Sequence, residues 1–114
     1  MEIFYKNYPV RQILALIGDM WTPVIIHCLS EGTLRFNELQ KRLPDISKKM
    51  LTQVLRRLEH DGLVHRKVYK VVPPKTEYSL TEQGQKIHEP INHLCAWARE
   101  HQELLSTIHD KKVK

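Results

Sequence analysis

The chain has 114 residues, of which 41% are hydrophobic and 27% are charged. That length suits one domain with a modest core and excludes two, and the composition is that of a globular chain rather than a disordered one. A formal net charge of +5 and a pI near 9.3 favour a polyanionic partner, although many basic proteins bind none.

The sequence gives no sign of a membrane or secreted protein. No apolar run approaches the length of a spanning helix, and the first six residues lack the order of regions found in a signal peptide. Cys28 and Cys95 lie far apart in apolar stretches, which suits small buried thiols in a reducing compartment. We therefore expect a cytoplasmic protein.

Two helices are predicted before residue 32. Apolar residues recur with helical period after Pro9, and Gly18 ends that helix. Asp19 or Thr22 can cap the next helix, which stops at Glu31-Gly32. Because this second helix is apolar on most sides, we place it at the centre of the core.

A very short strand at 34–35 precedes two predicted helices joined by a tight break. The first helix spans 37–43 and ends at Pro44, which disfavours helical geometry in the residue before it. Ser47 is a good N-cap for the second helix, and Gly62 can adopt the left-handed conformation past its end. One stripe of the second helix is apolar at i, i+3, i+4, i+7 spacing: Leu51, Val54, Leu55 and Leu58.

The other face of this second helix is polar and cationic. Such side chains hold phosphates and read base edges, so the pair of helices predicts a helix-turn-helix. A solvated helix face is the plainer interpretation. Arg57 lies closer to the core side and suits a phosphate or an intramolecular partner. The predicted DNA contacts in this segment are Arg35, Asn37, Ser47, Lys48, Lys49, Thr52, Gln53, Arg56 and Arg57.

A β-hairpin is predicted next, with strands at 64–69 and 76–80. The two prolines of the 70–75 connector exclude a tight two-residue turn, so the connector should project as a loop. Lys70 and Lys75, with Arg66, are expected to anchor phosphates, unless the hairpin is merely solvated. A helix-turn-helix followed by such a hairpin is a winged helix, here covering about 34–80 of a single domain at 1–114.

Thr81 can cap a final long helix that reaches about residue 108, with Pro90 inside it expected to bend or restart the helix. Beyond Pro90 the apolar positions alternate in steps of three and four, and Trp97 sits beside them. A stripe this long exceeds what one small domain covers, so we assign it to a partner subunit. Its members are Ile91, Leu94, Ala98, His101, Leu105 and Ile108.

Several ordered motifs resemble the HxlR-type family of winged-helix transcriptional regulators, close to the MarR-like proteins, from about residue 9 to residue 101. They are Gly18-Asp-Met-Trp21-Thr22, Arg35-Phe36-Asn37-Glu38-Leu39, Leu43-Pro44-x-Ile46-Ser47, Asp61-Gly62-Leu63-Val64 and Glu77-Tyr78-Ser79-Leu80-Thr81.

The resemblance implies a mostly α fold with a small β-hairpin wing (α+β). It also implies a homodimer built from terminal helices at 9–18 and 81–108, which adds Val10 and Ile13 to the interface. Two recognition helices would enter successive major grooves of double-stranded DNA. The implied function is a sequence-specific regulator, commonly a repressor.

One position departs from the resemblance. Several redox-sensing members carry a cysteine just before the proline that opens the first helix, where this chain has Tyr8. Thiol sensing by that route is not available, and a small-molecule effector is left unidentified.

Other functions have weaker support in the sequence. His88, His93, Cys95 and His101 are offset by five, two and six residues, which does not place metal ligands on one helix face. We expect no metal, no cofactor and no enzyme activity, since no catalytic arrangement stands out. Trp21 and Trp97 suit a core or an interface, with a small-molecule pocket between them as the alternative. The alternative functions are a low-specificity architectural DNA-binding protein and a protein-interaction module.

Overall fold

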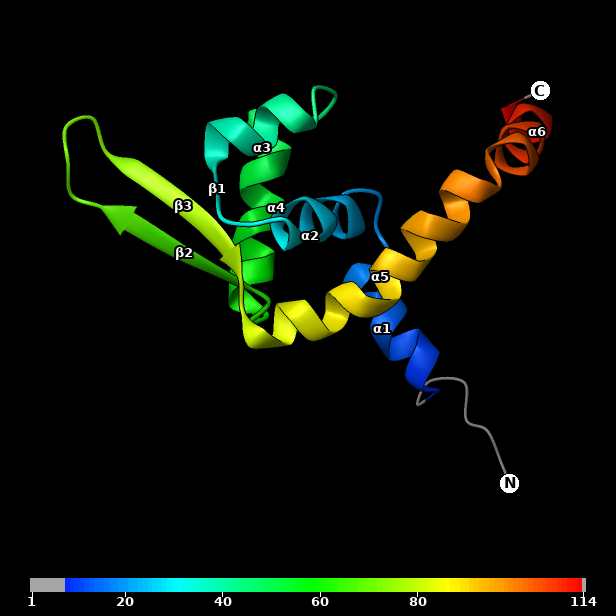
Figure 1. Cartoon of the computed structure of the whole chain (residues 1–114), viewed down its shortest axis with the longest axis horizontal. Helices are drawn as coiled ribbons and strands as arrows, with labels where there is room; N and C mark the ends of the chain where they lie inside the picture. Colours follow the sequence, from blue (N-terminus) through cyan, green and yellow to red (C-terminus); the bar gives the residue numbers. More distant parts are fainter. Residues whose placement is uncertain (1–7, 114) are drawn as a thin grey trace.

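The computed structural model describes residues 8–113, so the first six residues discussed above lie outside the described part. Figure 1 shows a helical body with a β-hairpin extending from one end and the last helix at the other. The fold is mostly α with one small sheet, as predicted. In chain order the elements are α1 (Pro9–Ile17), α2 (Thr22–Ser30), β1 (Leu34–Arg35), α3 (Phe36–Arg42), α4 (Lys48–His60), β2 (Val64–Tyr69), β3 (Lys75–Leu80), α5 (Glu82–Glu100) and α6 (Gln102–Val113).

The sheet is antiparallel, with strand order β1-β3-β2. Val64 pairs with Leu80 and Tyr69 with Lys75, so the predicted hairpin is confirmed to within one residue. The two-residue β1 adds a third strand by pairing Arg35 with Glu77. This pairing brings the start of α3 beside the base of the wing.

The core is centred on α2, as predicted. Ile25, Ile26 and Leu29 of α2 are almost completely buried, together with the apolar stripe of α4 that the sequence indicated. Among the described residues no single helix is long and apolar enough to cross a membrane. Helices α1 and α2 have the required length and composition when taken together, but the pair is bent by 81°.

Local hydrogen bonds fix the ends of the helices where the sequence placed them. The Ser47 hydroxyl accepts from the Met50 amide at 3.0 Å, and the Thr81 hydroxyl accepts from the Gly84 amide at 3.0 Å. Gly62, with φ of 77°, closes α4 in the left-handed conformation that disfavours other residues. The three caps are confirmed.

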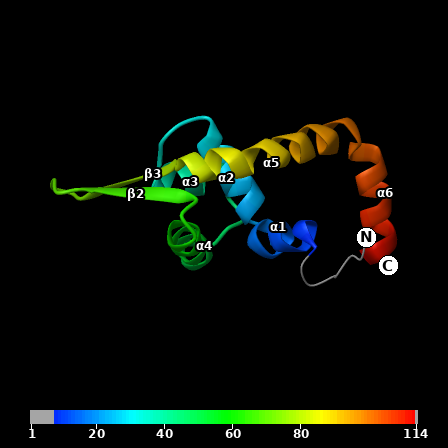
Figure 2. The same ribbon diagram turned by 90° about the horizontal axis from the view of Figure 1, so that it is seen from below.

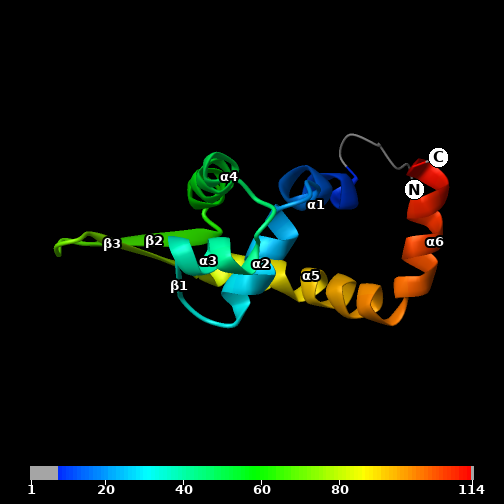
Figure 3. The ribbon, with the colours of Figure 1, turned by 90° about the horizontal axis from the view of Figure 1, so that it is seen from above.

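The C-terminal helix differs from the prediction, because it is not one helix reaching residue 108. Helix α5 runs without interruption through Pro90 and ends at Glu100. His101 leaves helical geometry, with φ of −120° and ψ of 34°, and its ring stacks on Trp97 with centroids 4.0 Å apart. Figures 2 and 3 show α6 turning sharply from α5 toward the side on which α1 and α4 lie. The predicted seam is therefore split between two helices of different direction.

Ile91 was predicted at the dimer interface, and this prediction is wrong. Its side chain is 0% exposed, because α5 packs on α2 through the stripe that contains Ile87, Ile91 and Cys95. Leu94 and Trp97 lie beside this stripe on the same helix and remain exposed. Both cysteines are half-buried rather than fully buried, which corrects the prediction of two core thiols.

Candidate nucleic-acid interface

The outer face of α4 presents the predicted cationic surface. Lys48, Lys49, Gln53 and Arg56 are exposed along it. Thr52 differs, because it is half-buried and its hydroxyl donates to the Lys48 carbonyl at 2.8 Å. The exposed members can therefore reach a ligand directly, while the hydroxyl of Thr52 is already engaged with its own helix.

The first turn of α4 is suited to binding an anion. The Ser47 oxygen accepts from the Met50 amide and still has its own proton to donate. Lys48 and Lys49 follow, and no acidic residue lies in this first turn. Cations at a helix N-terminus oppose the helix dipole and destabilise the helix, whereas a phosphate placed there is stabilised by the same charges. The local sequence therefore favours an occupied site over an empty one.

Residues from the start of α3 and from the wing loop line one shared recess of about 620 Å³. Arg35 and Asn37 contribute from one side and Lys75 from the other, with apolar loop residues such as Val72 between them. The β1–β3 pairing explains this convergence. Three of the predicted contacts are thus brought together, while Lys70 is exposed on the wing and does not line the recess.

A second recess, of about 270 Å³, lies where α4 meets the wing and contains Arg56. Arg66 of β2 and Glu59 of α4 form an ion pair there, with Nε 3.4 Å from Oε1. Tyr78 of β3 completes the wall, and burial raises the pKa of its hydroxyl despite the opposing charge of Arg66. The sequence did not predict Glu59 or Tyr78 as members of the candidate site, because the strand register that places them beside Arg56 was needed first.

Arg57 has an intramolecular partner. Its guanidinium donates to the Asp19 carboxylate at 2.8 Å and also to the Thr22 hydroxyl. Of the two roles that the sequence left open for Arg57, the structure shows the intramolecular one.

A separate apolar groove of about 520 Å³ lies between α1 and α5. Trp97 lines it together with Val10, Ile13 and Leu94, whereas Trp21 is not part of its wall. The suggested pocket between the two tryptophans therefore has no counterpart in this groove. Within residues 8–113, no cluster of three or more histidine, cysteine or acidic side chains could hold a metal ion.

A capped helix with an exposed cationic face, a short helix before it and a hairpin after it define a winged helix-turn-helix DNA-binding protein. The model of the HxlR-like helix-turn-helix family matches residues 16–106, and the chain belongs to this family.

Similar proteins agree with this assignment. The chain is 41% identical over 104 residues to the uncharacterised HTH-type transcriptional regulator YdeP of Bacillus subtilis, covering 91% of this chain and 81% of that protein. Among solved structures, the reduced form of the redox regulator HypR is 40% identical, with a TM-score of 0.82 over 87% of this chain and 98% of that chain. The regulator ytfH from Salmonella typhimurium is 33% identical, with a TM-score of 0.81 over 96% and 97%. The chain is a DNA-binding transcriptional regulator of the helix-turn-helix type and not an enzyme.

Proposed function

We propose that the chain binds an inverted-repeat operator as a homodimer in the cytoplasm and represses the genes next to it. The observation that carries this proposal is the exposed cationic face of α4, whose first turn is capped by Ser47, together with the recess that Arg35 and Asn37 form with the wing. Gln53 and Arg56 have side chains that can bond adenine and guanine edges. Ser47, Lys48, Lys49, Arg35, Asn37, Lys70 and Lys75 suit the phosphates on either side.

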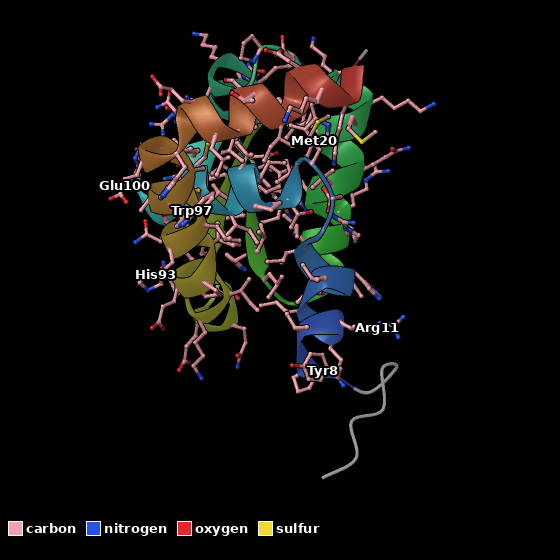
Figure 4. The ribbon with its side chains drawn as sticks, turned by 90° about the vertical axis from the view of Figure 1, so that its right-hand side faces the viewer. Tyr8, Arg11, Met20, His93, Trp97 and Glu100 are labelled. Atoms are coloured by element: carbon pink, nitrogen blue, oxygen red, sulfur yellow. The ribbon has the colours of Figure 1, made fainter. Side chains whose placement is uncertain are left out.

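The dimer is supported by the apolar surface left on the terminal helices. Leu94 is 60% exposed and Trp97 is 48% exposed, and both line the groove against α1. Figure 4 shows the side of the molecule on which Trp97 and His93 of α5, Arg11 of α1 and Tyr8, the residue before α1, lie. Leu105 and Ile108 are further exposed apolar residues, on α6. Apolar surface of this kind marks an interface in a soluble chain.

Not every predicted interface residue is equally available. Val10, Leu94, Trp97, Leu105 and Ile108 are exposed, whereas Ile13, Ala98 and His101 are half-buried. We propose that the exposed residues form the main contact and that the half-buried ones line its floor. For two copies of α4 to enter successive major grooves, this contact must hold them about 34 Å apart, which is one turn of duplex.

The proposal is tested by selecting bound fragments from the source genome and titrating the full chain against the selected and random duplexes at one fixed salt concentration. We expect a specific-to-nonspecific ratio of at least about 10³, a bound stoichiometry of two chains per site, and an inverted repeat in the selected fragments. A ratio near unity would instead support an architectural protein. No binding even at low salt would support a protein-interaction module.

Repression requires a separate measurement, because binding alone does not give the sign of regulation. A reporter driven by the promoter next to a selected operator should fall in output when the chain is expressed. An increase in reporter output would identify an activator and leave the DNA-binding part of the proposal intact.

A further inference from the structure

Asp19 stands at the centre of a closed network between two parts of the fold. Its Oδ1 accepts from the amides of Trp21 and Thr22 at 2.9 and 2.8 Å, directly before and at the start of α2. Its Oδ2 accepts from the Thr22 hydroxyl at 2.5 Å and from Arg57 at 2.8 Å. Burial disfavours the charged carboxylate, but hydrogen bonds from Thr22 and Arg57 outweigh it and lower the pKa of Asp19 well below its usual value.

The two ends of this network belong to different functional elements. Asp19 lies in the corner between α1 and α2, directly after the helix whose exposed residues line the groove against α5. Arg57 lies in the last turn of α4, whose outer face carries the proposed base contacts. The two residues are 38 positions apart in sequence, so the contact joins elements that the chain itself does not hold together.

The corner has little freedom to move independently of α1. The Gly18 amide donates to the Leu14 carbonyl oxygen at 2.7 Å, which ties the start of the corner to the last turn of α1. On the other side, Thr22 is fully buried and receives a hydrogen bond from Arg57. When the end of α1 is displaced, Asp19 is therefore expected to move with it.

We infer that Arg57 is a positioning residue and not a DNA contact: through Asp19 and Thr22 it fixes the angle of the recognition helix α4 to the dimer-forming helix α1. The inference rests on the proposed function, because it concerns how a dimer sets the spacing of its two recognition helices. A phosphate contact would require Arg57 to leave both the Asp19 carboxylate, to which it donates at 2.8 Å, and the fully buried Thr22 hydroxyl.

The contact between Arg57 and Asp19 should affect which spacing of operator half-sites the dimer prefers. Exposed ion pairs add little to stability, so the loss of this one should leave the chain folded. It should, however, let α4 rotate relative to α1, and the two α4 helices of a dimer would then accept half-sites at more than one separation. Any ligand that shifts α1 would act on operator affinity through the same contact.

The test compares Arg57→Ala, Asp19→Asn and the double variant on the selected operator and on versions with one base pair added or removed between half-sites. Asp19→Asn keeps one oxygen that can accept from the Trp21 and Thr22 amides and removes both the charge and the oxygen that accepts from Arg57. We expect each single variant to reduce the discrimination between spacings by about tenfold, and the double variant to lose no more than either single one. Arg57→Lys, which can still pair with Asp19, should recover part of the discrimination.

Lys49→Ala is the matched control, because Lys49 is a proposed phosphate contact on the same helix. It should weaken binding at all spacings and reduce the slope of log affinity against log salt by about one. If Arg57→Ala behaves like Lys49→Ala while Asp19→Asn binds as the wild type does, Arg57 is a phosphate contact and the inference is overturned. A wild-type chain that shows no operator preference would overturn the proposed function itself, and the inference with it.

Discussion

Glu59 on α4 and Arg66 on β2 form an ion pair across the junction of the recognition helix and the wing, with Arg66 Nε 3.4 Å from Glu59 Oε1. The pair lines the same recess as Arg56, the proposed guanine contact. It joins two elements that a DNA duplex would contact together. The ion pair is therefore one contact between the wing and α4, and its acidic member, Glu59, does not itself favour DNA.

Substitutions in the Glu59–Arg66 pair can separate two effects on DNA binding: the orientation of the wing and the charge of the surface near the phosphates. Glu59→Gln should strengthen binding to random duplex, because it removes a negative charge near the phosphates, and should lower the specific-to-nonspecific ratio. Arg66→Ala should weaken both kinds of binding. Each variant should change the free energy of unfolding by no more than about 1 kcal/mol, since the pair is partly exposed. Duplex titrations and urea unfolding measure these effects, and a weaker binding of Glu59→Gln to random duplex would contradict the assignment.

Replacing Arg56 and replacing Lys75 are predicted to change DNA binding in different ways. Arg56→Ala should weaken operator binding by about 1–3 kcal/mol and relax the preference at one base position in each half-site. Lys75→Ala should weaken binding to all sequences by a similar factor and flatten the salt dependence. Affinities for a panel of single-base operator variants at two salt concentrations distinguish the two. An unchanged specificity ratio in Arg56→Ala would remove Arg56 from the base contacts.

The elements that local signals define were predicted well. Ser47, Gly62 and Thr81 mark helix ends by their own chemistry, and the α4 stripe follows from its period. The break at His101 has no such signal, because neither glycine nor proline lies there, whereas Pro90 attracted the prediction and is accommodated within α5.

The errors at the candidate sites have a different cause. In α5 the buried and the exposed apolar residues follow the same three- and four-residue spacing. The sequence pattern therefore could not distinguish the buried Ile91 from the exposed Leu94. Long-range polar contacts are equally invisible. Arg57 and Asp19 are paired only because the fold brings α4 to the α1–α2 corner.

A pH dependence is predicted from His27 on α2 and His88 on α5, whose Nδ1 and Nε2 atoms lie 3.0 Å apart. One nitrogen must donate and the other accept, so the contact requires that at least one ring is neutral. Burial, together with His27, lowers the pKa of His88 in the folded chain. The unfolded chain then binds protons more readily below about pH 6.5, so the free energy of unfolding should fall as the pH drops below that value.

Thermal unfolding from about pH 8 to about pH 5 measures this effect. His88→Gln should flatten the decline between about pH 6.5 and about pH 5, whereas His93→Gln, at an exposed position on the same helix, should leave it unchanged. An identical decline in wild type and His88→Gln would show that other groups cause the dependence.

The cysteines are predicted to react slowly in the folded chain. Burial raises the pKa of the Cys28 thiol, despite the nearby guanidinium of Arg42, and so reduces the thiolate that reacts. With Tyr8 before Pro9, mild peroxide or diamide should not release operator DNA. Labelling with a disulfide reagent before and after unfolding, in Cys28→Ser and Cys95→Ser as well, measures each thiol. Rapid stoichiometric labelling coupled to loss of DNA binding would contradict this prediction.

The last prediction concerns the apolar surface on α5 and α6. Leu94 and Leu105 are 60% and 41% exposed, so replacing both with glutamate should leave the fold of the protomer intact. In a dimer the same charges would be buried without partners, which strongly disfavours association. The variant should therefore be a monomer by light scattering at micromolar concentration.

Its operator affinity should fall by at least about 100-fold, because each half-site would be bound without the advantage of the linked second site. Gln85→Glu, at an exposed position on the same helix, adds a like charge away from the groove and should remain dimeric. Circular dichroism establishes that each variant is folded before affinities are compared. If the wild type itself is monomeric at micromolar concentration and binds its operator with full affinity, the groove between α1 and α5 has another use and the two-fold arrangement of recognition helices is wrong.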